Sequence, residues 1–81
     1  MPSPLLRRPD VSQRTGKPRS SLYRDIALGM FPPPIKIGQK SVAWPADEVD
    51  ALVRARVAGK SEEQIRSLVS RLVSQRSAAG A

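Results

Sequence analysis

Three consecutive prolines, Pro32-Pro33-Pro34, divide this chain into two parts that cannot belong to one continuous helix. Proline lacks an amide hydrogen and its ring clashes with the preceding helical turn, so the run is expected to be extended. Helical patterns occur on both sides of the prolines, and alternating apolar and polar residues follow them directly. Because 81 residues suffice for one small domain only, these parts are expected to pack on one core.

Two short helices joined by a tight turn are expected before the prolines. The first begins at about Pro9, since proline suits a first helical turn, and ends at Thr15-Gly16. The second runs from about residue 18 to residue 28, after which Gly29 can adopt the left-handed conformation of a helix cap. The expected order is therefore helix, turn, helix.

A small hairpin is expected after the prolines. Ile35-Lys36-Ile37 and Val42-Ala43-Trp44 alternate in polarity, and Gly38-Gln39-Lys40 between them is typical of a turn. Two strands alone are marginally stable in water, so this hairpin must pack on the helices. The residues expected to face inward are Ile35, Ile37, Val42 and Trp44. Trp44 and the nearby Phe31 are interpreted as core anchors rather than as platforms for bases.

Two more helices are expected in the second half. One starts near Ala46, with acidic residues in its first turn, where the helix dipole favours negative charge, and Gly59 ends it. Its expected apolar stripe is Val49, Leu52, Val53 and Val57. Ser61-Glu62-Glu63-Gln64 matches a capping box and predicts a further helix to about Gln75. The apolar stripe of that helix is Ile65, Leu68, Val69, Leu72 and Val73.

Net charge is distributed unevenly along the chain. Fourteen Lys and Arg residues oppose seven Asp and Glu residues. Through Pro45, eight basic residues oppose two acidic ones, whereas six oppose five from Ala46 onward. A basic excess confined to one half indicates an anionic polymer as partner, although a solvated basic surface would have the same composition.

Two absences narrow the classes of function. The chain has no cysteine and no histidine, which removes thiolate metal sites and most nucleophile–base pairs, and no cofactor is expected. An enzyme is the least supported class, since Asp47, Glu48 and Asp50 are explained by the helix dipole. No apolar run approaches the roughly 20 residues that span a bilayer, and Met1-Pro2-Ser3-Pro4 does not resemble a signal peptide. No membrane association is expected, and the expected location is the bacterial cytoplasm.

The segment from Arg19 to Arg24, Arg-Ser-Ser-Leu-Tyr-Arg, is the main functional candidate. It opens the second helix with Leu22 directed inward and polar side chains free to face outward. Arginine suits guanine O6 and N7 or a bidentate phosphate contact, and hydroxyl groups can donate to backbone oxygens. In a helix-turn-helix, the N-terminal residues of the second helix meet the bases. An ordinary solvated face would be the alternative.

The chain resembles the AlpA family of phage and mobile-element regulators. The resemblance rests on Arg14-Thr-Gly-Lys-Pro-Arg-Ser-Ser-Leu-Tyr-Arg24, Gly29-Met-Phe-Pro-Pro-Pro-Ile-Lys-Ile-Gly38 and Val42-Ala-Trp44 before an acidic helix start, and it covers about residues 6–57. It implies a mostly α fold with one small β-hairpin, a winged helix-turn-helix. Pro18 departs from the usual polar cap, and Arg8 from a usual apolar residue.

The resemblance implies that the second helix reads the major groove and that the hairpin is a wing. The candidate DNA-binding residues are Lys17, Arg19, Ser20, Ser21, Tyr23, Arg24, Lys36, Gln39 and Lys40. The implied function is a sequence-specific, double-stranded DNA-binding regulator of transcription. An excisionase that bends DNA for an integrase is an alternative, and an integrase or RNA polymerase is a candidate partner.

The expected organisation has four parts: a flexible N-terminus (1–4), the winged helix-turn-helix (5–58), an additional helix (59–76) and a flexible tail (77–81). The additional helix lies beyond the resemblance to the AlpA family. Its stripe could pack on its own domain or on a second copy in a homodimer. A further alternative is a protein-interaction module that docks through helix 61–75, with the basic face incidental.

Overall fold

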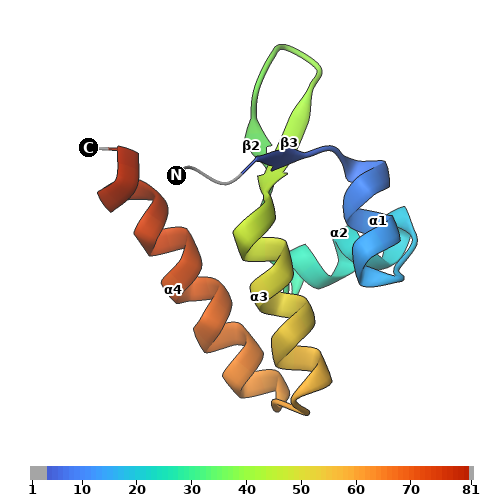
Figure 1. Cartoon of the computed structure of the whole chain (residues 1–81), viewed down its shortest axis with the longest axis vertical. Helices are drawn as coiled ribbons and strands as arrows, with labels where there is room; N and C mark the ends of the chain where they lie inside the picture. Colours follow the sequence, from blue (N-terminus) through green and yellow to red (C-terminus); the bar gives the residue numbers. More distant parts are fainter. Residues whose placement is uncertain (1–3, 81) are drawn as a thin grey trace.

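The computed structural model describes residues 4–80, which form four helices and a small antiparallel sheet (Figure 1). The expected flexible N-terminus lies outside the described residues except for Pro4. The carbonyl of Pro4 accepts a hydrogen bond of 2.8 Å from the Ala46 amide, so this residue is attached to the domain. Among the described residues, no helix combines the length and apolar character needed to cross a bilayer.

The first two helices confirm the expected helix-turn-helix. Helix α1 (Arg8–Thr15) ends at Gly16, which adopts a left-handed conformation with φ 72°. Helix α2 (Arg19–Ala27) has Pro18 as its N-cap without a side-chain cap bond, as expected from the proline at that position. Gly29, with φ 76°, turns the chain away after α2. Only glycine adopts these dihedral angles without strain, so local sequence fixes both ends.

A three-stranded sheet follows the order β1-β3-β2, and all pairs are antiparallel. Strands β2 (Ile35–Lys36) and β3 (Val42–Pro45) form the expected hairpin, and the Ile37 amide donates to the Ser41 carbonyl at 2.9 Å. Strand β1 (Leu5–Leu6), which the sequence did not predict, pairs with the other edge of β3. The fold is mostly helical with a small sheet, a winged helix-turn-helix.

The expected inward face of the hairpin is only partly correct. Trp44 is fully buried, and Ile35 and Val42 are half-buried, but Ile37 is 44% exposed. Ile37 lies beyond the last ladder pair, in the loop that projects from the helices (Figure 1). Ala43 is buried instead. Strand β3 is central and contacts both α1 and α3, so two successive residues are enclosed and simple alternation fails.

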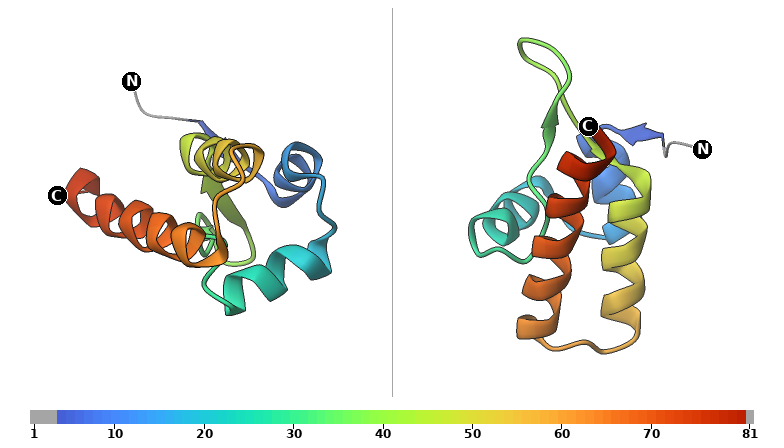
Figure 2. Two further views of the ribbon diagram at one scale, coloured as in Figure 1. Left: turned by 90° about the horizontal axis from the view of Figure 1, so that it is seen from below. Right: turned by 90° about the vertical axis from the view of Figure 1, so that its left-hand side faces the viewer.

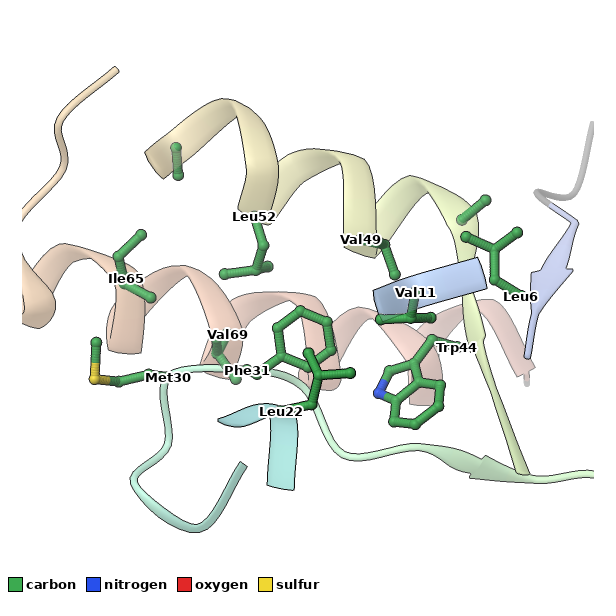
Figure 3. Packing of buried hydrophobic residues seen from close by; sticks show 12 residues of the cluster. Leu6, Val11, Leu22, Met30, Phe31, Trp44, Val49, Leu52, Ile65 and Val69 are labelled. Atoms are coloured by element: carbon green, nitrogen blue, oxygen red, sulfur yellow. The ribbon is translucent and has the colours of Figure 1, made fainter. Parts of the chain in front are cut away.

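The core lies between the four helices and the base of the hairpin (Figure 3). Trp44 packs with a ring-centroid distance of 6.3 Å to Phe31, and its Nε1 donates to the Pro32 carbonyl at 2.8 Å. Both aromatic residues are core anchors, as predicted. The hydrogen bond ties the proline run to the wing strand, which fixes the direction of the chain between α2 and the hairpin.

Helices α3 (Ala46–Val57) and α4 (Glu62–Gly80) lie side by side (Figures 1 and 2). The stripe predicted for α3 is wrong at Val57, which is 84% exposed, whereas Ala55 is buried. The stripe predicted for α4 packs on the core of its own domain. Seen from below (Figure 2, left), α1 and α3 lie on one side of the core and α2 and α4 on the other.

The predicted capping box is present at the start of α4. The Ser61 amide donates to Gln64 Oε1 at 2.9 Å, and the Gln64 amide donates to Ser61 Oγ at 3.2 Å. The other end of α4 was predicted less well, because the helix continues past Gln75 to Gly80. Ala78 and Ala79 have the highest helix propensity, which favours this extension.

Replacing Ser61 with alanine is expected to lower the free energy of unfolding by about 1 kcal/mol, since an N-cap acceptor is lost. Urea unfolding followed by far-UV circular dichroism measures this difference. Ser74→Ala, an exposed change within α4, is the matched control and is expected to have little effect. An equal change in both variants would contradict a capping role for Ser61.

A buried ion pair, which the sequence analysis missed, anchors α4 to α3. Arg76 contacts both carboxylate oxygens of Glu48, at 2.9 and 2.5 Å, and donates to the Pro33 carbonyl at 2.8 Å. Glu48 had been assigned to the dipole of its helix, yet its side chain is buried. Its partner lies 28 positions away, a distance that no local pattern reveals.

Candidate nucleic-acid interface

Helix α2 is anchored along one side and exposed along the other. Leu22 is fully buried, Ile26 is half-buried, and Asp25 is only 5% exposed. Ser20, Arg24 and Ala27 are exposed and lie four and three positions apart. This spacing places the three residues on one outer stripe, because about 3.6 residues make one helical turn. The outer stripe therefore presents a hydroxyl, a guanidinium and a methyl group.

Arg19 and Tyr23 occupy the flank of α2 rather than its outermost stripe. The Arg19 guanidinium lies 5.6 Å from the centroid of the Tyr23 ring, a cation–π arrangement. Tyr23 is 39% exposed, so part of its ring is covered while the rest is accessible. Ser21, on the other flank, is half-buried. The predicted recognition residues thus lie on one helix but face different directions.

Lys17 plays a part in the structure that the sequence analysis did not foresee. Its ammonium lies 2.5 Å from the buried carboxylate of Asp25, and Arg56 from α3 lies 4.0 Å from the same oxygen. This cluster joins the turn, α2 and α3, and so holds the orientation of α2. Lys17 is therefore placed toward Asp25 and away from the outer stripe of α2.

The three predicted wing residues are all exposed, but they differ in whether they share a surface with residues of α2. Lys36 lies on strand β2, whereas Gln39 and Lys40 lie in the loop of the hairpin. Lys40 borders a concave surface of about 580 Å³ that Arg19 and Tyr23 also line. Lys36 and Gln39 do not line this concavity.

The same concavity contains two arginines that were not among the predicted site residues. We call it the basic concave surface; its lining residues are Arg7, Arg8, Pro9, Arg19, Tyr23, Lys40 and Val42. None of these residues is acidic. Arg7 and Arg8 could have been identified from the sequence as a basic pair at the start of the first helix, within the basic half of the chain.

Helix α4 contacts the C-terminal end of α2. The Arg66 Nε donates to the Leu28 carbonyl at 3.0 Å, at the C-terminal end of α2. A carbonyl at a helix end has no partner within the helix, so this contact satisfies it and fixes that end. The exposed face of α2 is therefore held by contacts from the turn, α3 and α4.

A tight turn between two helices, an exposed outer face on the second and a hairpin after it define the class of winged helix-turn-helix proteins. The particular family follows from comparison with known sequences. Residues 4–57 match the model of the family described as prophage CP4-57 regulatory protein (AlpA). The chain belongs to this AlpA family, as its sequence motifs predicted, and α4 lies beyond the matched region.

One similar protein comes from Enterobacteria phage P4, where it bears the description uncharacterized protein ORF88. It is 44% identical to this chain over 56 residues, which cover 69% of this chain and 64% of the phage protein. The chain thus spans less than two thirds of the length of that relative. The word regulatory comes from the description of the family, and the similar protein from phage P4 carries no described role.

Proposed function

We propose that the protein is a sequence-specific, double-stranded DNA-binding regulator of transcription in a phage or other mobile element. Helix α2 enters the major groove, and the β2–β3 wing lies along the flanking backbone. The single observation that carries this proposal is the outer face of α2. That face presents Ser20 and Arg24 without an acidic neighbour, because the one acidic residue of α2, Asp25, is buried and paired.

The chemistry of this face suits the edges of base pairs. A major groove of about 12 Å admits one helix, and arginine can donate two hydrogen bonds to guanine O6 and N7. Serine can contact a base or a phosphate, and the methyl group of Ala27 can contact a thymine methyl. The description of the family as regulatory supports a role in gene control. Because DNA is the proposed ligand, the proposed location is the bacterial cytoplasm.

The apolar stripe of α4 gives no support to a docking or dimerisation role, since it packs on its own core. An excisionase function remains the nearest alternative within DNA binding. Bending of the selected DNA site in a gel, together with capture of an integrase, would favour excision. Footprints over a promoter and contact with RNA polymerase would favour regulation.

Selection of bound duplexes from a random pool tests the proposal. The expected result is an enriched motif whose affinity falls steeply with salt, with a slope of log K against log salt of about −0.9 for each neutralised phosphate. Fluorescence anisotropy over a salt series measures this slope. A scrambled duplex is the control and should bind more weakly at every salt concentration. Equal affinity for both duplexes in dilute buffer would contradict the proposal.

A further inference from the structure

We propose that the basic concave surface binds the DNA backbone, with Arg7, Arg8 and Lys40 as phosphate ligands and Arg19 as a backbone contact rather than a base reader. This inference rests on the proposed function and adds a division of roles to it. The outer stripe of α2 reads bases, whereas the concavity beside it holds the phosphates of the adjacent strand segment.

The first support is convergence from three elements. Arg7 and Arg8 come from the start of α1, Arg19 from the start of α2, and Lys40 from the wing loop, yet all line one concavity. A concave surface lined by cations and no carboxylate concentrates positive potential and attracts an anion. The first turn of α1 also contains Asp10, but this residue does not line the surface.

The second support is that these cations are unpaired. Within residues 4–80, the side chains of Arg7, Arg8 and Lys40 form no hydrogen bond or ion pair. Other basic side chains of the described chain, such as Lys17 and Arg76, are bound to buried carboxylates. Gathering like charges in one concavity carries a repulsion that a bound anionic ligand would offset.

The third support is the placement of Arg19. Its guanidinium is held beside the Tyr23 ring, on the flank of α2 that borders the concavity. A guanidinium oriented by an aromatic ring retains its donors for the two oxygens of a phosphate. Tyr23, which lines the same surface, has a hydroxyl that can donate to a backbone oxygen. Arg24, by contrast, lies on the outer stripe, beyond this surface.

The closing experiment compares four variants on the selected duplex, on that duplex with one base pair changed, and on a scrambled duplex. The variants are Arg7→Ala/Arg8→Ala, Arg19→Ala, Arg24→Ala and the control Arg54→Ala/Arg71→Ala. The control removes the same charge as the first variant, from exposed positions on α3 and α4 outside the concavity. Far-UV circular dichroism first establishes that each variant is folded.

Arg7→Ala/Arg8→Ala is expected to weaken binding to all three duplexes by the same factor, about tenfold, and to flatten the salt slope by about 1.8. Arg19→Ala should also leave the preference between duplexes unchanged, with a slope about 0.9 shallower. Arg24→Ala should reduce the preference for the selected site by about tenfold or more. A neutral methylphosphonate placed at the contacted phosphate should weaken DNA binding by the wild-type protein. It should not further weaken DNA binding by Arg7→Ala/Arg8→Ala.

Two results would overturn the inference while leaving the proposed function intact. One is a salt slope for Arg7→Ala/Arg8→Ala equal to that of the control, and the other is a loss of base preference in Arg19→Ala. If the wild type itself does not discriminate between duplexes, the proposed function fails as well. If Arg7→Ala/Arg8→Ala does not fold, the salt slope of Arg7→Gln/Arg8→Gln and its response to the methylphosphonate test whether Arg7 and Arg8 contact phosphates.

Discussion

Replacing Trp44 with alanine is expected to remove most of the protein's free energy of unfolding. Trp44 is fully buried and contacts the Phe31 ring, so its removal opens a large cavity in the core. Such truncations cost about 3–5 kcal/mol. A domain of this size has a total stability near the lower end of about 5–15 kcal/mol, so the loss removes most of it.

Urea unfolding followed by far-UV circular dichroism measures this effect without relying on tryptophan fluorescence. Two further variants separate its causes. Trp44→Phe retains an apolar ring but leaves the Pro32 carbonyl without its donor, and should cost about 1–3 kcal/mol. Val57→Ala, at an exposed apolar position, should change stability little. A Trp44→Ala variant as stable as the wild type would contradict the description of Trp44 as a core anchor.

Replacing Glu48 with alanine is expected to lower the free energy of unfolding by about 3–5 kcal/mol, because the charge of Arg76 then loses its buried partner. Arg76 contacts both oxygens of Glu48 and is itself largely covered. The same substitution removes the ion pair that joins the C-terminal part of α4 to α3. Arg66, which contacts the C-terminal end of α2, lies near the other end of α4, so the DNA affinity of the folded variant is expected to change little.

Chemical denaturation of single and double variants tests this ion pair. The free energy of unfolding that Glu48→Ala/Arg76→Ala loses should be smaller than the sum of the losses in the two single variants. Such non-additivity indicates a direct interaction between the two side chains. Glu62→Ala is the matched control: its contact with Arg66, at 4.0 Å, joins two exposed side chains and should contribute little. Additive losses in the double variant would show that Glu48 and Arg76 act independently.

The local elements of the fold were predictable because their boundaries depend on near neighbours. Gly16 and Gly29 supply left-handed caps, and Ser61 and Gln64 satisfy each other's amides, all within a few residues. The errors arose where burial depends on distant packing. Ile37 and Val57 fit their periodic patterns but project beyond the region that the core covers. Strand β1 is too short for any periodic pattern.

The candidate site was predictable along one helix and no further. Ser20 and Arg24 lie on the outer face of α2, as the position of Leu22 on the opposite face required. Lys17 was one of the candidate DNA-binding residues. The structure instead brings it to Asp25, because a buried carboxylate needs a cation nearby. The DNA contacts themselves remain predictions.

From the sequence alone, the identity and order of the helices, the turn, the hairpin and the AlpA family could be determined, since these depend on short-range stereochemistry and on motif spacing. The tertiary structure alone decided which charged residues meet. It paired Glu48 with Arg76 and Lys17 with Asp25, and it gathered Arg7, Arg8 and Lys40 around one concavity. The physical reason is that electrostatic interactions depend on separation in space, which the order of residues along the chain does not specify until the core has packed.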